Sequence, residues 1–190
     1  FYDRLTDDKD RLWLIQILRD RVKVRFGQDF DKICDHLQTV NESGEMSTEI
    51  EIPQIRRLLF GDFEFPDGKR AYEEMKDPDN VIAVCNNYLE DYNGLSKKPM
   101  DLVLFQYMIE HVTRISRVLR SPGGNALLVG VGGSGRQSCT RLAASIMDYT
   151  VVEIEISKTY GKNEWREDLK RLLTTAGGDG KSAELTELYR

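Results

Sequence analysis

A glycine-rich turn at residues 130–138 constrains the fold of this chain more than any other feature of its sequence. It reads Gly-Val-Gly-Gly-Ser-Gly-Arg-Gln-Ser and follows the apolar run Ala-Leu-Leu-Val at residues 126–129. A short apolar strand, a turn of glycines and a helix-forming stretch are the layout of a phosphate-binding loop. Glycines let several backbone N–H groups approach a phosphate, and the helix N-terminus adds further donors. The sequence therefore predicts an α/β fold with a nucleotide site.

The P-loop pattern GxxxxGK[ST] fits this turn only in part. Gly130 and Gly135 occupy the two glycine positions, but Arg136 stands where the pattern has lysine and Gln137 where it has a hydroxyl residue. Arg136, Gln137 and Ser138 are nevertheless polar groups at the place where a phosphate needs donors. About 120 mostly helical residues also precede the predicted strand, whereas a dinucleotide fingerprint usually opens its domain. These two features favour the P-loop interpretation.

The same glycines also match the Rossmann fingerprint GxGxxG, with Gly130, Gly132 and Gly135 in its three positions. Glu153 and Glu155 lie ~20 residues further on, where a Rossmann fold places the acidic residue that binds ribose. A glycine-rich turn that binds nothing is a third interpretation. Spacing alone leaves the three open.

Composition narrows the classes of partner. The chain has 27 basic and 32 acidic residues and a net charge of −5, so no overall field favours nucleic acid or an anionic membrane. Its longest apolar runs are far shorter than the ~20 residues of a membrane span. Three scattered cysteines and two histidines do not form a set of metal ligands. We expect no nucleic acid, no membrane and no metal held by a protein cluster.

Hydrophobic periodicity predicts a helical first part and an α/β second part. Polar stretches and glycines end several of the predicted elements, including Gly177, Gly178 and Gly180 after the last helix. The predicted helices cover residues 6–26, 29–37, 79–92, 99–119, 138–147 and 162–174, and the predicted strands cover 126–129 and 151–156. An irregular connector is expected over residues 52–77. The predicted domains are an all-α segment at 1–60, a connector and helix at 61–98, and an α/β part at 99–190.

Five segments of the chain carry a family resemblance: residues 99–105, 111–120, 124–138, 154–158 and 165–170. They closely resemble the fourth AAA+ module of dynein heavy chains, while residues 1–5 and 10–11 look like the helical end of the third module. Arg136-Gln137 in place of lysine and a hydroxyl residue is similar to axonemal, rather than cytoplasmic, dyneins. The resemblance covers residues 1 to about 182. It implies a partial P-loop AAA+ module, with a parallel sheet and flanking helices, preceded by an all-α lid segment.

The resemblance also implies ligands and roles for particular residues. It implies ATP or ADP as the ligand, and Arg136 as a clamp on phosphate oxygens. Gln137 lacks the hydroxyl that binds Mg²⁺, and Ser138 offers a hydroxyl one residue later. Whether Mg²⁺ accompanies the nucleotide is therefore left open by the sequence. By comparison with related modules, residues 99–102 contact adenine. The residues expected at the nucleotide are Gly130, Gly132, Gly133, Ser134, Gly135, Arg136, Gln137, Ser138, Met100 and Leu102.

Hydrolysis needs an acidic pair after an apolar strand, which the family places just after Ser182. Residues 183–190 depart from that pattern and look like a short helical end, an altered terminus or a splice product. We expect no catalytic residue in this chain. The resemblance implies a regulatory segment within an ATP-driven microtubule motor of the ciliary axoneme and cytoskeleton, in the cytoplasm. Its implied partners are other AAA+ modules, the microtubule, and dynein light and intermediate chains. A degenerate loop in a structural, inter-module element is the alternative.

Overall fold

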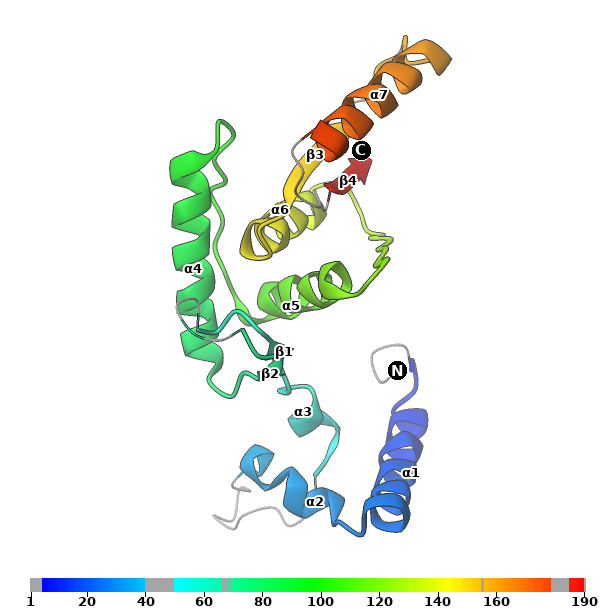
Figure 1. Cartoon of the computed structure of the whole chain (residues 1–190). Coiled ribbons are helices and arrows are strands. Elements are labelled where there is room, and N and C mark those ends of the chain that lie inside the picture. Colours follow the sequence, from blue (N-terminus) through cyan, green and yellow to red (C-terminus); the bar gives the residue numbers. More distant parts are fainter. Residues whose placement is uncertain are drawn as a thin grey trace. The chain divides into compact units, whose positions relative to one another are not determined.

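The computed structural model describes residues 5–39, 50–65, 68, 70–154, 156–178 and 185–189. It divides the chain into two compact units, Phe1–Leu58 and Leu59–Arg190, which are described separately below. The first unit is helical in its described residues, and the second combines helices with short strands (Figure 1). Among the described residues, no helix is both long and apolar enough to cross a membrane.

The first unit contains α1 (Asp8–Phe26), α2 (Phe30–Ile33), a 3₁₀ turn (Asp35–Leu37) and α3 (Ile52–Ile55). Asp7 caps α1 by accepting a hydrogen bond from the Lys9 N–H, and Gly27 ends it with a positive φ of 65°. The predicted helix over 6–26 is therefore confirmed. We expected Leu14, Leu18 and Val22, with Ile15 and Phe26 beside them, to form its buried face. Ile15 is buried, but Leu18 and Phe26 are 37% and 75% exposed, so the buried face is narrower than predicted.

The prediction of a single helix over residues 29–37 is wrong. The chain leaves the α-helical conformation at Cys34 and continues as a 3₁₀ turn. Cys34 and Leu37 are buried together with Ile50 in a small core, and the tighter turn accompanies this burial of both side chains. The polar stretch at 41–48, predicted to break the helical pattern, lies outside the described residues.

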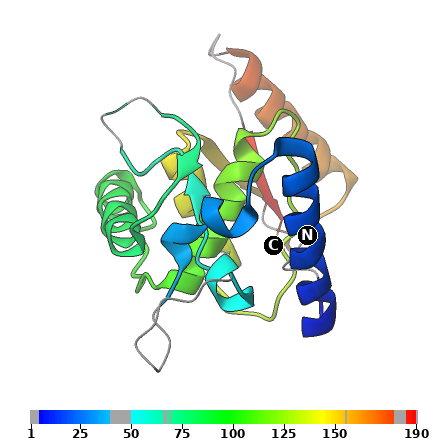
Figure 2. The ribbon, with the colours of Figure 1, turned by 90° about the horizontal axis from the view of Figure 1, so that it is seen from below.

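The second unit opens with a two-residue antiparallel pair, β1 (Phe60–Gly61) and β2 (Glu73–Glu74). Its helices are α4 (Pro78–Leu95), α5 (Gln106–Arg120), α6 (Arg136–Ile146) and α7 (Lys162–Gly178), and its other strands are β3 (Thr150–Ile154) and β4 (Leu185–Tyr189). Helices α4, α5 and α6 pack against one another, and α6 also contacts β3. Figure 2 shows α4 nearly end-on beside this group.

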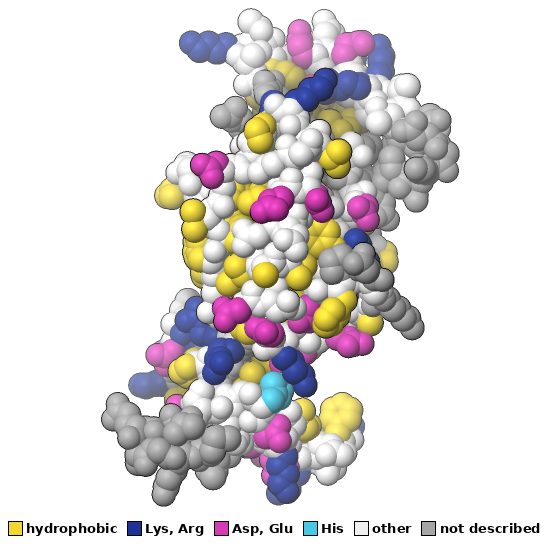
Figure 3. Space-filling model, turned by 90° about the vertical axis from the view of Figure 1, so that its left-hand side faces the viewer, with side chains coloured by type: hydrophobic (Ala, Val, Ile, Leu, Met, Phe, Trp, Pro, Cys, Tyr) yellow, Lys and Arg dark blue, Asp and Glu magenta, His cyan; other side chains and the backbone are white. Residues whose placement is uncertain are grey.

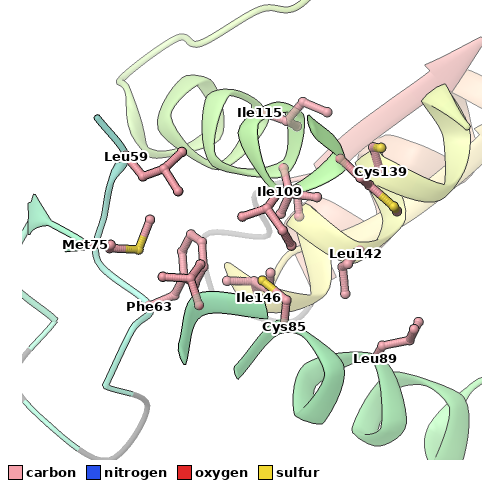
Figure 4. Packing of buried hydrophobic residues seen from close by; sticks show 14 of the residues in the cluster. Leu59, Phe63, Met75, Cys85, Leu89, Ile109, Ile115, Cys139, Leu142 and Ile146 are labelled. Atoms are coloured by element: carbon pink, nitrogen blue, oxygen red, sulfur yellow. The ribbon is translucent and has the colours of Figure 1, made fainter. Parts of the chain in front are cut away.

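One hydrophobic core joins these three helices to the segment around β1 and β2. Phe63, Val81, Val112, Leu142 and Ile146 are completely buried in it. Figure 4 shows side chains from α4, α5 and α6 pointing toward one another and toward the β1–β2 segment. Burial of side chains of this size contributes about 1.5–3 kcal/mol each, so the core fixes the position of α6.

The helix predicted over 99–119 begins later than expected. Residues 101–105 are not helical, and α5 starts only at Gln106. The side chain of Asn93 accepts a hydrogen bond from the Met100 N–H at 2.7 Å and donates one to the Met100 carbonyl at 2.8 Å. Because both backbone groups of Met100 are bound by Asn93, they are not used in a helix. The prediction of a helix start at Pro99 was wrong for this reason.

Two predictions about strands were also wrong. Residues 126–129 form no paired strand in the described part of the chain, and Leu127 and Val129 are 91% and 86% exposed. Residues 185–189, expected to be helical, form β4, which pairs in parallel with β3 in the register Thr150↔Leu185 to Ile154↔Tyr189. Helix α7 connects the two strands, as a parallel pair requires. It also runs through Gly177, past its predicted end.

Candidate nucleotide site

The glycine-rich turn has the backbone conformation that its glycines allow. Gly133 and Gly135 have φ values of 77° and 76°, in the left-handed region that other residues rarely adopt. Gly135 is the N-cap residue of α6, and no side chain caps this helix end. The first N–H groups of a helix have no partner within the helix, so those following Gly135 are donors that an anion can use.

The turn is exposed, while the helix that follows it is anchored. Residues 130–134 are exposed and residues 135–138 are half-buried. Within the turn, the Ser134 N–H donates to the Val131 carbonyl at 3.3 Å, and the Cys139 N–H donates to the Gly135 carbonyl at 2.8 Å. Further along α6, Leu142 and Ile146 are completely buried in the core. A rigid helix therefore carries an accessible turn of backbone donors.

The Arg136 side chain extends from the start of α6 back to the residues that precede and begin the turn. Its Nη1 donates to the Leu128 carbonyl at 3.4 Å and its Nη2 to the Val131 carbonyl at 3.1 Å. A Cβ atom at Gly130 would lie 2.9 Å from the Ser134 Oγ and 3.4 Å from the Arg136 Cδ. A side chain at Gly130 would therefore require the Ser134 hydroxyl to move. The guanidinium predicted to clamp phosphate is bound to backbone carbonyls in this structure.

The two residues predicted to contact adenine lie in and against the core. Met100 is 7% exposed and belongs to the same cluster as Cys139 of α6, and Leu102 is half-buried against that cluster. Leu128, which precedes the turn, also packs on it. The structure therefore brings the 99–102 segment and the base of the loop onto one core, while the glycines lie on the surface outside it.

Glu153, one of the two candidates for ribose contact, is held by two cations. Arg141 of α6 donates from its Nε to the Glu153 Oε1 at 2.5 Å, and the Lys98 Nζ lies 3.8 Å from the Oε2. This set links α6, β3 and the segment before Met100. Sequence analysis missed it, because three charged residues far apart in the chain give no local signal. Glu155, the other candidate, lies outside the described residues.

The described residues supply neither a group of metal ligands nor an accessible cysteine thiol to the candidate nucleotide site. In the part of the chain that the structure describes, no three His, Cys, Asp or Glu residues are grouped so that they could hold a metal ion. Burial raises the pKa of the Cys85 thiol to about 12 and also raises that of Cys139. Both are core residues, and the structure assigns them to packing.

Charge on the surface is mixed. On the face shown in Figure 3, basic side chains are interspersed with acidic ones and do not form a continuous basic surface. Around the core, individual cations are matched with carboxylates. Arg120 bonds to Asp62 and lies 5.4 Å from the centre of the Tyr72 ring. Such pairs fix local geometry and contribute little net free energy where they are exposed.

Comparisons with known proteins place these features in a family. Residues 100–186 match the model of the P-loop containing dynein motor region D4. The chain is 43% identical over 176 residues to dynein axonemal heavy chain 12 of Mus musculus and 44% identical over 176 residues to that of Homo sapiens, in each case covering 91% of the chain. It is 40% identical over 183 residues, 96% of the chain, to dynein axonemal heavy chain 3 of Homo sapiens.

The matched region is a small part of these relatives. It covers 6% of the two heavy chains 12 and 4% of the heavy chain 3. The match to motor region D4 contains the glycine-rich turn, α6, β3 and α7, and the relatives extend the similarity over the helical first unit. The chain therefore belongs to the family of axonemal dynein heavy chains.

Proposed function

We propose that this chain is a nucleotide-binding, regulatory segment of an axonemal dynein heavy chain, and that residues 130–138 hold the phosphates of ADP or ATP. The observation that carries the proposal is the uncapped N-terminus of α6, preceded by two glycines in the left-handed conformation. Backbone N–H groups and the positive end of a helix dipole are suited to a phosphate. The family match to a P-loop containing region supports the same ligand class.

In this proposal the backbone of the turn does most of the binding. The N–H groups of Gly132 to Gln137 surround a phosphate, and the buried face of α6 keeps them in place. Gln137 has no hydroxyl for Mg²⁺, and the Ser138 hydroxyl is the available substitute on the first turn of α6. Met100 and Leu102 place the adenine near the core, on the side of the 99–102 segment.

We further propose that the segment binds nucleotide without turnover. Arg136 and Gln137 stand where the P-loop pattern has the lysine that reaches the phosphates and the hydroxyl residue that binds Mg²⁺, and P-loop hydrolysis uses both. A bound nucleotide that is not hydrolysed can act by shifting the equilibrium between conformations of the larger protein. The role proposed for the segment is therefore regulatory.

The remaining proposals concern the larger protein and rest on the axonemal relatives. In it, the second unit is part of an AAA+ module with a parallel sheet and flanking helices, and the first unit is the helical lid that ends the preceding module. The whole is an ATP-driven motor on microtubules in the ciliary axoneme. Its partners are its own other modules, the microtubule, and light and intermediate chains.

A structural, non-binding role is the second candidate, and one observation favours it. The Arg136 guanidinium is already bound to the carbonyls of Leu128 and Val131, so the turn is closed by its own side chain. A Rossmann-type site has less support, because Glu153 is bound to Arg141 and Lys98.

A thermal-shift series separates the candidates. A ligand that binds only the folded state raises the melting temperature, and a concentration of 100 times Kd adds about 2.7 kcal/mol. We expect ADP and ATP to raise the melting temperature of the 190-residue chain and NAD to leave it unchanged. A shift with NAD alone would support the Rossmann interpretation, and no shift with any of the three would support the structural role.

A further inference from the structure

Arg136 has contacts in the empty turn that a phosphate would have to compete with. Its guanidinium donates to the Leu128 carbonyl on one side of Gly130 and to the Val131 carbonyl on the other. Leu128 belongs to the segment that enters the turn and Val131 to the turn itself, so one side chain holds the entry segment and the turn together. The Arg136 side chain also passes close to Gly130, since a Cβ atom there would lie 3.4 Å from the Arg136 Cδ.

The position of Arg136 on α6 makes this arrangement electrostatically unfavourable without an anion. Arg136 is the first residue of α6, and no acidic residue stands in that turn. Cations near a helix N-terminus oppose the helix dipole, which favours negative charge there. A phosphate bound to the N–H groups of the turn would add an attraction for the Arg136 guanidinium that opposes its repulsion by the helix dipole.

We propose that Arg136 is a latch operated by phosphate, a proposal that rests on the nucleotide site proposed above. In the empty state the guanidinium holds the carbonyls of Leu128 and Val131. When phosphate binds, the guanidinium transfers to the phosphate oxygens, because hydrogen bonds between two charged groups are stronger than those to a neutral carbonyl. The Leu128 carbonyl then loses its bond to Arg136, and the Val131 carbonyl keeps only its bond from the Ser134 N–H.

Residues 127–131 are the segment through which phosphate binding would affect the rest of the protein. Leu127, Val129 and Val131 are 91%, 86% and 79% exposed, so their side chains are available to a neighbouring part of a larger protein. Leu128, between them, packs on the core. A change in the hydrogen bonds of the Leu128 and Val131 carbonyls therefore alters the segment that carries these exposed side chains. Arg136 is the positioning residue that couples the two.

Nuclear magnetic resonance of the arginine side chains tests the latch directly. The probe is the 15N-labelled 190-residue chain, with the Arg136 guanidinium signals assigned by their loss in Arg136→Lys. ADP and inorganic pyrophosphate should both shift these signals, and adenosine should not, since phosphate operates the latch. If ADP binds and the Arg136 signals stay in place, the latch is wrong and the nucleotide site stands. If neither ADP nor pyrophosphate binds, both proposals fail.

Hydrogen exchange supplies a readout without ligand. Arg136→Ala should speed the exchange of backbone amides over residues 128–134 several-fold, because the entry segment and the turn are no longer held together. Arg117→Ala, which removes an exposed arginine from α5, is the matched control and should leave this exchange unchanged. Exchange as slow in Arg136→Ala as in the unmodified chain would overturn the latch. Retention of slow exchange in α6 in both variants shows that the fold is intact.

Discussion

At the scale of single residues, Arg136 separates a binding role of the turn from a structural one. Its two hydrogen bonds go to carbonyls of an exposed segment, so its removal should affect global stability by no more than about 0.5 kcal/mol. A phosphate contact is a charged hydrogen bond, whose loss costs about 1.5–3 kcal/mol. We therefore predict that Arg136→Ala weakens ADP binding by that amount and leaves the melting temperature of the empty chain nearly unchanged.

Isothermal titration of ADP and urea unfolding of the empty chain measure the two quantities. Arg117→Ala serves again as the control, since it removes a cation without touching the turn. A loss of stability in empty Arg136→Ala that equals its loss of binding free energy would mean that Arg136 is a structural residue.

At the scale of elements, the carboxylate of Asp31 links α1, α2 and the segment at Ile50 in the first unit. Asp31 of α2 accepts from the Nε and Nη2 of Arg19 on α1, both at 2.8 Å, and from the Ile50 N–H at 2.8 Å. The Arg19 side chain, more than any other group, holds the pKa of Asp31 below its usual value of 3.8. A carboxyl group with a lowered pKa stabilises the fold above its ordinary pKa, and this stabilisation is lost as the pH falls through the folded-state value.

We accordingly predict that Asp31→Asn destabilises the chain at neutral pH by about 1.5–3 kcal/mol and makes its stability less dependent on pH below about 4. Urea unfolding followed by far-ultraviolet circular dichroism, repeated from about pH 6 to 3, measures both effects. Asp20→Asn, at an exposed position of α1, is the control and should resemble the unmodified chain. An unchanged stability of Asp31→Asn at neutral pH would refute the role assigned to this cluster.

Packing of α6 gives the second prediction at this scale. Leu142 is completely buried, so Leu142→Ala should cost about 2–5 kcal/mol, whereas Leu127 is 91% exposed and Leu127→Ala should change stability by no more than about 0.5 kcal/mol. Urea unfolding of the two variants compares the same substitution at a buried and an exposed site. Similar losses in both would show that Leu127 is covered in solution.

Elements with local signals could be predicted from the sequence. Asp7 and Asp77 cap α1 and α4 as such residues commonly do, and apolar residues at helical spacing identify α4 and α6. Strand β3 was recognisable from its β-branched residues. The turn at 130–138 was likewise predictable, because only glycines allow its conformation.

The predictions that were wrong concern elements that depend on contacts between residues far apart in the chain. Strand β4 has only five residues and follows a polar stretch, and its pairing with β3 is what makes it a strand. The late start of α5 follows from the hydrogen bonds of Asn93 to Met100. Residues 126–129 have the composition of a strand but no partner strand among the described residues. Local propensity cannot anticipate such tertiary contacts.

At the scale of the whole molecule, exposed apolar side chains predict self-association. Val103, Leu127, Val129 and Val131 are each at least 79% exposed, on segments that are neither helix nor strand. Extended segments with unpaired backbone groups and apolar side chains tend to pair with other chains. We predict that the sedimentation coefficient of the 190-residue chain rises with concentration, and that Leu127→Lys combined with Val129→Lys suppresses the rise. A monomer at all concentrations would contradict this.

The most direct test of the central claim is the affinity of the 190-residue chain for ADP when the turn is altered and when it is not. Gly135→Ala and Gly123→Ala form a matched pair, since both glycines have positive φ values, 76° and 63°, with open space around the Cβ position. The backbone strain of about 1–2 kcal/mol is therefore the same. By isothermal titration we predict that the unmodified chain and Gly123→Ala bind ADP equally and that Gly135→Ala binds at least tenfold more weakly. Equal affinity of all three, or no binding by the unmodified chain, would contradict the account.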